Sequence, residues 1–452
     1  MEKKLAECKH SNFLNSAEVD NITDKILSIA KKCGASSAEV AVNFDKGLSV
    51  STRLGEVETV EFNQDKNFAV TVYFDKRRGS ATSSDTTEDS LQALVARACD
   101  IAKVSDEDPC FGLAEPALLA TNFPELDLNH PWDIEVTDAI ELAKQCEQTA
   151  LNSDKRIVNS DGSNISSYGF LRAYANSNGF SHSFLASRHS KSCILLAQDE
   201  DGLKRDYEYT TARDPKNLLS EDVLADRAVH KTLQRLGAQK LTTRSCPVIF
   251  SNDVSSSLLG AFISAISGSN IYRKSSFLLD QVGQAIFPEK YTIQEFPYIK
   301  GELGSAAYDM EGVQTRENVF IADGVLQHYL LDCYSARRLG LETTANAGGV
   351  HNLSISHDNV SLDDIVKEIQ CGLIVTSMMG SAVSLITGDY SRGASGFWVE
   401  NGQIQYPVDE ITIASNLKDM FKNIQLIGND IDPRKSTKCG SILISDMTVA
   451  GK

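Results

Sequence analysis

The sequence lacks several features, and each absence disfavours a class of protein. None of its ten cysteines belongs to a Cys-x-x-Cys pair, and most lie in apolar segments, as is typical of reduced thiols in a cytoplasmic protein. Positive charge is also scarce, because 44 lysines and arginines stand against 61 acidic residues and leave a net charge of −17. Since such a surface repels phosphate groups, we expect neither a nucleic acid nor an anionic membrane as a partner.

Unbroken hydrophobic runs are missing too. The two uncharged segments of membrane-spanning length, 254–272 and 369–388, are rich in serine or interrupted by glycine. We therefore predict that both segments are buried in a globular protein, and that the protein is cytoplasmic.

Common catalytic motifs are absent as well. No histidine precedes a glutamate, so the sequence contains no His-Glu-x-x-His zinc helix. It also contains no Gly-x-Gly pair of a dinucleotide loop, no phosphate-binding Walker loop and no Gly-x-Ser-x-Gly nucleophile turn. Together these absences disfavour the standard hydrolase and nucleotide-binding classes.

The length of 452 residues predicts several domains, and the changes in hydrophobic pattern predict an α+β fold. Residues 1–105 combine helical spacing with alternating strands, which predicts an N-terminal sheet flanked by helices. Residues 106–238 predict a linker followed by a meander of strands. Residues 239–452 predict a large, β-rich C-terminal domain of mixed and antiparallel sheets.

Asp-Gly and Asn-Gly pairs between alternating segments predict tight turns, because these residues tolerate the positive φ angles that such turns need. The pairs are Asp161-Gly162, Asn178-Gly179, Asp201-Gly202, Asp323-Gly324 and Asn401-Gly402. Residues 373–386 are apolar with small residues interleaved, which predicts strands buried inside a sheet.

Two polar patches are candidate contacts for a peptide or a partner chain. Arg273 and Lys274 follow a predicted Ser-rich helix, where they either contact a carboxylate or complement the dipole of a solvated helix end. Residues 388–398 predict a constrained loop, in which Gly393 allows close backbone approach and Asp389 and Arg392 orient a ligand. The alternative for this loop is a tight turn with an internal Asp–Arg pair.

Cys439, followed by Gly440, is a further candidate. Its thiolate is a possible zinc ligand or nucleophile, and the alternative is an ordinary buried thiol. No histidine is near it in the sequence, so His351 or His357 can reach it only through the fold.

Several segments together resemble the TldD/PmbA family, also described as modulators of DNA gyrase, and resemble its PmbA/TldE branch most closely. The resemblance covers essentially the whole chain, and its most specific part is residues 388–398. The segments are Tyr-Arg-Lys-Ser-Ser at 272–276, Asp-Met-Glu-Gly-Val at 309–313, Ser-Ala-Arg-Arg-Leu-Gly-Leu at 335–341, Asn-Ala-Gly-Gly at 346–349, Gly-Asp-Tyr-Ser-Arg-Gly-Ala-Ser-Gly-Phe-Trp at 388–398 and Gly-Asn-Asp at 428–430.

The resemblance implies that this chain has lost a zinc site. In the TldD branch, a zinc metallopeptidase, a His-Glu-x-x-x-His helix precedes an Arg-Lys pair and a later Cys-Gly completes the site. Aligned on the Arg-Lys pair at 273–274, those helix positions are Gly260, Ala261 and Ala265, whereas Cys439 remains. Because zinc needs about three protein ligands and catalysis needs a carboxylate base, the resemblance implies no metal ligand set, no cofactor and no catalytic residue here.

The chain is thus expected to be the non-catalytic subunit of a cytoplasmic zinc peptidase heterodimer, with zinc in a TldD-type partner. By resemblance, the pair degrades peptides and removes leader segments, and the peptide enters as an extended strand. We expect a homo- or hetero-oligomer whose shared face lies in 369–398. Two alternatives stay open, an autonomous hydrolase that uses Cys439 with His351 or His357, and a protein-binding regulator, for example of DNA gyrase.

Overall fold

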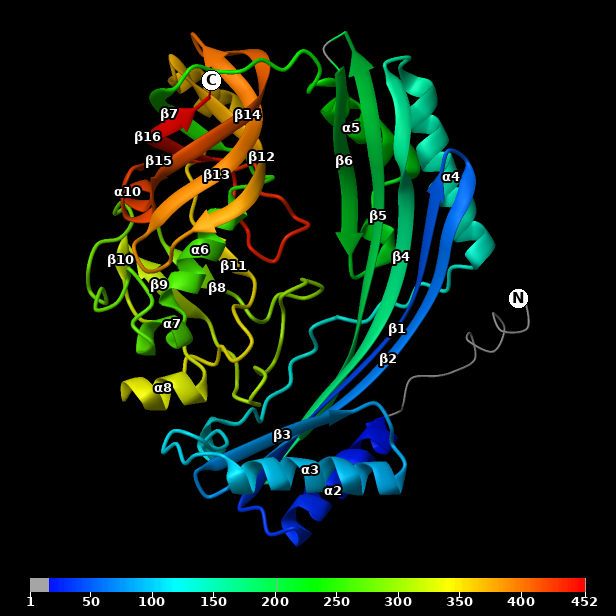
Figure 1. Ribbon diagram of the computed structural model, residues 1–452, viewed down its shortest axis with the longest axis vertical. Coiled ribbons are helices and arrows are strands. Elements are labelled where there is room, and N and C mark those ends of the chain that lie inside the picture. The colour runs from blue at the N-terminus through cyan, green and yellow to red at the C-terminus, as the bar shows by residue number, and fades with distance from the viewer. Residues whose placement is uncertain (1–15, 201, 452) are drawn as a thin grey trace.

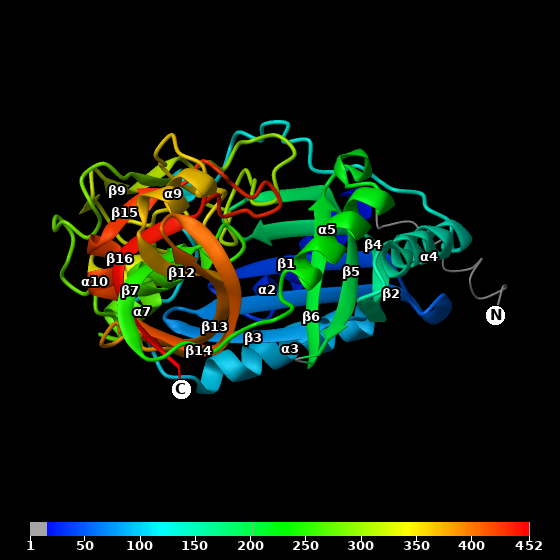
Figure 2. The same ribbon diagram turned by 90° about the horizontal axis from the view of Figure 1, so that it is seen from above.

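The computed structural model describes residues 16–200 and 202–451. Its strands form three sheets, and a long six-stranded sheet runs beside a more compact C-terminal part (Figures 1 and 2). The combination of helices with mostly antiparallel sheets confirms the predicted α+β fold class. Among the described residues, no helix has the length and apolar character needed to cross a membrane.

The N-terminal part consists of helices packed on one end of the long sheet. Its elements are α2 (Ser16–Lys32), β1 (Ser37–Arg53), β2 (Glu56–Phe74), β3 (Arg77–Ser83) and α3 (Glu88–Val104). Alternate side chains of β1, among them Val40, Val42 and Phe44, are buried in one cluster with Ile26 of α2 and Val95 of α3. Apolar side chains that repeat every two residues in the strand and about every 3.6 residues in the helices therefore pack together in one apolar layer.

The middle part continues the same sheet. Its elements are the single-turn 3₁₀ helix η1 (Pro116–Leu118), α4 (Val136–Ser153), β4 (Ile157–Asn176), β5 (Ser181–Asp199), β6 (Gly202–Ala212), the 3₁₀ helix η2 (Pro215–Asn217) and α5 (Glu221–Leu233). The strand order is β3-β2-β1-β4-β5-β6, and β1 pairs with β4 along almost its whole length. One sheet thus joins the first two predicted domains, and the division into three domains stays a prediction.

The predicted turn at Asp161-Gly162 is wrong, because both residues lie inside β4. The pairing of β4 with β5 shifts by one residue between Ser160 and Gly162, which is the signature of a β-bulge. Gly162 has a φ of +108°, and a Cβ atom there would lie 2.7 Å from the carbonyl oxygen of Thr52. The glycine therefore allows a β-bulge in β4 and the close approach of the neighbouring strand β1. The Asn178-Gly179 turn between β4 and β5 is confirmed, whereas Asp201 lies outside the described residues.

The C-terminal part contains a small sheet and a strand barrel. The first elements are β7 (Arg244–Phe250), α6 (Ser256–Ile266), α7 (Gly268–Tyr272), β8 (Ile293–Glu295), β9 (Asn318–Ala322), β10 (Val325–Leu326), α8 (Cys333–Leu339) and β11 (Leu353–Ile355). The later ones are α9 (Leu362–Glu368), β12 (Cys371–Val383), β13 (Asp389–Glu400), β14 (Gln403–Asn416), α10 (Leu417–Lys422), β15 (Ile424–Ile427) and β16 (Ile442–Ala450). The order β14-β13-β12-β7-β16 closes on itself because β14 also pairs with β16.

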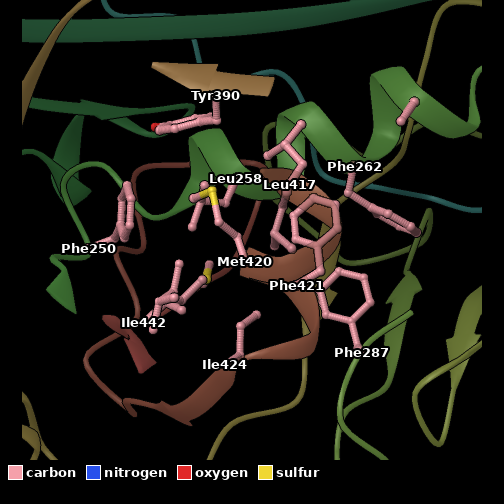
Figure 3. Packing of buried hydrophobic residues seen from close by; sticks show 14 of the residues in the cluster. Phe250, Leu258, Phe262, Phe287, Tyr390, Leu417, Met420, Phe421, Ile424 and Ile442 are labelled. Atoms are coloured by element: carbon pink, nitrogen blue, oxygen red, sulfur yellow. The ribbon is translucent and has the colours of Figure 1, made fainter. Parts of the chain in front are cut away.

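The barrel and α6 share the largest hydrophobic cluster of the described residues (Figure 3). Phe262 of α6 packs edge-on against Phe287, with ring centroids 5.3 Å apart, and Phe287 stacks on Phe421 of α10 at 4.9 Å. Leu258 lies one turn before Phe262 and is equally buried. These contacts fix α6 against the barrel, so that its opposite face is left for solvent or a ligand.

The expectations for residues 369–398 are only partly confirmed. In β12 the residues Leu373–Val375 are buried as predicted, but Met379 is 59% exposed and Ile386 beyond the strand is 66% exposed. The predicted loop at 388–398 is wrong, because these residues form the strand β13 from residue 389 on. By contrast, the Asp323-Gly324 and Asn401-Gly402 hairpins are confirmed.

In this segment Gly396 is needed because the neighbouring strand approaches closely, and not because the chain turns there. A Cβ atom on Gly396 would lie 1.7 Å from the carbonyl oxygen of Ile374 on β12. The register between β12 and β13 shifts next to this contact, between Val375 and Ser377, and the two backbones approach too closely for a side chain.

We predict that Gly396→Ala lowers the free energy of unfolding by about 2 kcal/mol or more, because overpacking forces two paired strands apart. Urea denaturation followed by tryptophan fluorescence measures the change. Gly260→Ala is the matched control, since nothing lies within 4 Å of its added Cβ and alanine favours a helix by about 0.5–1 kcal/mol. Equal effects of the two substitutions would contradict the prediction.

Candidate functional site

A cavity of about 790 Å³, the interdomain cleft, lies between the middle part and the C-terminal part. One wall comes from β5, β6 and α5 with the residues that follow it, and it includes Arg188 and Tyr209. The other wall comes from the start of α6, from β12 and β13, and from the loop at 434–437. In Figure 1, β6 is the strand of the long sheet that lies nearest the barrel.

A buried ion-pair cluster joins the two walls. Glu208 of β6, whose side chain is only 4% exposed, contacts Lys231 of α5 at 2.9 Å and also pairs with Arg434 of the C-terminal part. Arg434 binds Asp432 through two parallel hydrogen bonds of 2.7 and 2.9 Å, and Lys231 also reaches Asp253 at 3.2 Å. Burial alone raises the pKa of Glu208, but Lys231 and Arg434 outweigh it and hold the pKa below its ordinary value.

The structure places Arg392 in the interdomain cleft, but it does not place the neighbouring candidates with it. Asp389 is exposed and accepts hydrogen bonds from Thr387 at 2.6 Å and from Asn416 at 3.3 Å. Within the described residues it forms no ion pair with Arg392, so the internal Asp–Arg pair is not formed. Gly393 lies in β13 between two paired strands, and it does not line the cleft.

Arg273 and Lys274 lie away from the cleft. The guanidinium groups of Arg273 and Arg338 lie over the ring of Tyr272, at 5.5 and 5.6 Å from its centroid. Lys274 lines a different cavity, of about 530 Å³, together with Tyr272 and Arg338. The two basic patches named from the sequence are therefore separate features of the surface.

The three positions where the zinc-binding relatives are expected to carry two histidine ligands and a glutamate base all lie on α6. Gly260 is exposed, Ala261 is half-buried and Ala265 is fully buried. Hydrogen and methyl side chains offer no lone pair to a metal ion, so these residues do not fit zinc. Among residues 16–200 and 202–451, no three His, Cys, Asp or Glu side chains come together as a metal-binding group.

Cys439 is a buried thiol, and its Sγ donates to the carbonyl oxygen of Gly440 at 3.3 Å. Burial raises the pKa of this thiol to about 12, so the nucleophilic thiolate is scarce at neutral pH. Nδ1 of His351 lies 3.3 Å from the carbonyl oxygen of Gly304, and Nδ1 of His357 lies 2.9 Å from that of Asp358. In the part of the chain that the structure describes, no hydrogen bond joins Cys439 to either histidine.

A third cavity, of about 200 Å³, contains carboxylates that were not predicted from the sequence. Glu39 of β1 accepts hydrogen bonds from the hydroxyls of Tyr73 at 2.9 Å and Tyr174 at 2.7 Å. Glu311, from the Asp-Met-Glu-Gly-Val segment, lines the same cavity, and burial together with the charge of Asp309 raises its pKa to about 7. The sequence signals were a glutamate within the apolar strand pattern around residue 39 and the Asp-Met-Glu-Gly-Val segment at 309–313.

Comparisons with known proteins identify the family. Three domains described for PmbA/TldA metallopeptidases match residues 38–102 (domain 1), 129–236 (central domain) and 243–451 (C-terminal domain). The chain is 47% identical to "Metalloprotease PmbA" of Escherichia coli O157:H7 over 92% of both chains, and 45% identical to a PmbA homologue of Haemophilus influenzae over 94% of both.

Solved structures share the fold. A candidate modulator of DNA gyrase from Bacteroides thetaiotaomicron has a TM-score of 0.92 at 24% identity, covering 97% of this chain and 100% of that one. TldE from Thermococcus kodakarensis has a TM-score of 0.81 at 21% identity, covering 95% of this chain and 100% of that one. At these identities the likeness establishes the fold alone.

We predict that Cys439 resists alkylation by iodoacetamide at pH 8 in the folded protein, because its raised pKa keeps the thiol protonated and the side chain is inaccessible. Mass spectrometry after digestion measures labelling at each cysteine. The exposed Cys33 and Cys371 are internal controls that should react. Labelling of Cys439 at the rate of these two would contradict its assignment as a buried thiol.

We also predict that Glu311 makes the protein less stable as the pH rises. The folded carboxyl keeps its proton up to about pH 7, whereas the unfolded one loses it near 4.5, so stability falls as the pH rises between these values. Glu311→Gln should therefore stabilise the protein more at pH 8 than at pH 5, as measured by urea midpoints. The exposed Glu58→Gln is the control. An equal effect of Glu311→Gln at both pH values would contradict the assignment.

Proposed function

Because the chain belongs to the PmbA/TldD metallopeptidase family, we propose that it is the non-catalytic, PmbA/TldE-type subunit of a zinc peptidase heterodimer. In this proposal a TldD-type partner holds the zinc, and this chain helps to bind the peptide. The heterodimer degrades peptides or removes leader segments in the cytoplasm.

The composition of α6 is the observation that carries the proposal. Positions 260, 261 and 265 would have to supply two ligands and a general base, but glycine and alanine have neither donor atoms nor a titratable group. Cys439 is the one residue of the expected zinc site that this chain keeps, and burial holds its thiol in the protonated form. A helix that keeps its packing while lacking its reactive groups suits a scaffold subunit.

The interdomain cleft is the place proposed for the peptide. β6 ends the order of the six-stranded sheet, so one of its edges has no strand partner among the described residues. An extended peptide can add to such an edge through main-chain hydrogen bonds, without requiring a particular sequence. Tyr207 and Tyr209 of β6 line the cleft and supply apolar surface for peptide side chains.

The proposed face toward a partner subunit lies at the exposed end of β12. Met379 and Ile386 are large apolar side chains that the described chain leaves more than half exposed. Apolar side chains that are exposed together are typical of subunit interfaces.

A second candidate function is regulation of DNA gyrase through protein contact. It is favoured by the description of two solved neighbours, from Bacteroides thetaiotaomicron and Thermotoga maritima, as candidate modulators of that enzyme. The net charge of −17 disfavours contact with DNA but not with protein. Affinity purification that recovers gyrase without a TldD-type subunit would favour this candidate.

We predict that the purified chain carries no stoichiometric zinc and cleaves no peptide. Co-expression with a TldD-type subunit should give a complex with about one zinc per heterodimer that cleaves unfolded peptides and is inhibited by a chelator. Elemental analysis and a fluorogenic peptide assay measure both properties.

The matched control is a complex whose partner has lost its zinc-binding histidines, which should assemble but not cleave. Zinc bound by the isolated chain, together with chelator-sensitive cleavage, would overturn the proposed function.

A further inference from the structure

The interdomain cleft has a local excess of positive charge in an otherwise acidic protein. Both acidic side chains that line it are already paired, Asp206 with Arg235 at 3.3 Å and Asp253 with Lys231 at 3.2 Å. Two guanidinium groups that line the same cavity, those of Arg188 and Arg392, have no carboxylate within ion-pair distance among the described residues. These two charges are uncompensated.

Arg392 is held in a fixed position on the barrel wall. It lies two residues after Tyr390 on β13, so both side chains are on the same face of the strand. The phenol of Tyr390 donates to Sδ of Met378 at 3.2 Å, and its oxygen lies beside the guanidinium of Arg392. Tyr390 is 3% exposed and packs above α6 (Figure 3), so it is a positioning residue for Arg392.

The guanidinium of Arg392 is incompletely satisfied. Its Nε atom is buried and has no hydrogen-bond partner in the described part of the chain. A buried donor without an acceptor is unfavourable, and more so when it carries charge. Arg392 also lines the cleft, and its planar guanidinium matches the geometry of a carboxylate.

Further donors surround the same space. Arg188, on β5 of the opposite wall, uses its Nε to donate to Thr211 at 3.2 Å. Four hydroxyl side chains line the cleft and have no hydrogen-bond partner among the described residues: Thr376, Ser377, Ser436 and Thr437. Hydroxyls and guanidinium groups together form a donor set for an anion, whereas both acids that line the cleft are already paired.

We propose that Arg392, assisted by Arg188, binds a carboxylate of the peptide in the interdomain cleft. The proposal rests on the proposed function, which places a peptide there, and it adds a specificity for anionic groups. Two sources share this chemistry, the C-terminal carboxylate of the peptide and the side chain of Asp or Glu. Binding of either one makes Arg392 a specificity-determining residue, while the partner subunit supplies the chemistry of cleavage.

The test measures binding directly, so that it does not depend on cleavage. Fluorescence anisotropy records the affinity of short N-terminally labelled peptides for the isolated chain and for the complex with its partner. The peptides have a free or amidated C-terminus, combined with a central Glu or Gln. The variants are Arg392→Gln, Arg392→Lys and Arg188→Gln, and the matched control is Arg97→Gln, an exposed arginine on α3 away from the cleft.

We expect the amidated Gln peptide to bind about tenfold or more weakly than one of the carboxylate peptides. Arg392→Gln should abolish that difference, Arg392→Lys should restore part of it, Arg188→Gln should reduce it and Arg97→Gln should leave it unchanged. The peptide whose affinity falls in Arg392→Gln identifies the source of the carboxylate. Circular dichroism and assembly with the partner show that each variant is folded.

Equal affinity for all peptides, or a carboxylate preference that survives in Arg392→Gln, would overturn the inference. The proposed function fails separately, when the complex with the partner holds no zinc or cleaves no peptide. If the complex cleaves the amidated Gln peptide as well as it cleaves every peptide that carries a carboxylate, the proposed function holds and the carboxylate site is rejected. Absence of any peptide binding to the isolated chain and the complex rejects the site as well.

Discussion

The ion-pair cluster around Glu208 is the interaction on which the interdomain cleft depends. Glu208 belongs to the outermost strand of the long sheet, whereas Arg434 belongs to the C-terminal part, so their pair ties the two walls together. Removal of one partner from a buried ion pair costs about 3–5 kcal/mol, because the other charge is left without compensation. Lys204 of β6 adds a second link at 3.0 Å to Asp409 of β14, and Arg235 a third at 2.8 Å to Ser395. Two ion pairs and one hydrogen bond to a hydroxyl therefore join the two walls of the cleft.

The helix α6 keeps its packing against the barrel although the expected zinc-site positions on it carry only glycine and alanine. Phe262 and Leu258 face the barrel core and determine where the helix lies. Gly260 lies on the exposed side of the helix, where a relative that binds zinc would carry a ligand. Ala265, by contrast, is fully buried in the same cluster as Leu258 and Phe262, so the expected site positions span both the exposed and the packed side of the helix. A helix that keeps its packing but has no donor atoms at these positions agrees with the proposed role as a binding subunit.

The α+β fold class and the hairpins could be predicted because their signals are local. Asn401-Gly402 and Asp323-Gly324 sit between strands that pair directly, so the turn residues and the register agree. The predictions at Gly162 and Gly396 failed because each glycine is required by the close approach of a neighbouring strand that is distant in the sequence. Likewise, Arg392 could be named as a candidate, but Arg188 could not, since only the fold brings β5 and β13 to one cavity. The pairing of Glu39 with two tyrosines was missed for the same reason.

The protein is acidic overall, but the interdomain cleft is locally positive, and this contrast determines at what range the cleft can select a ligand. A net charge of −17 repels an acidic peptide at long range, but at physiological salt this field decays within about 8 Å. Inside the cleft the acids Asp206 and Asp253 are paired with their own partners, so the unpaired Arg188 and Arg392 leave a local positive charge. Recognition of a carboxylate therefore occurs only after the peptide has entered, and it acts mainly through the dissociation rate rather than through electrostatic steering. Such short-range selection agrees with the proposed function, in which the cleft admits unfolded chains and retains those that present a carboxylate.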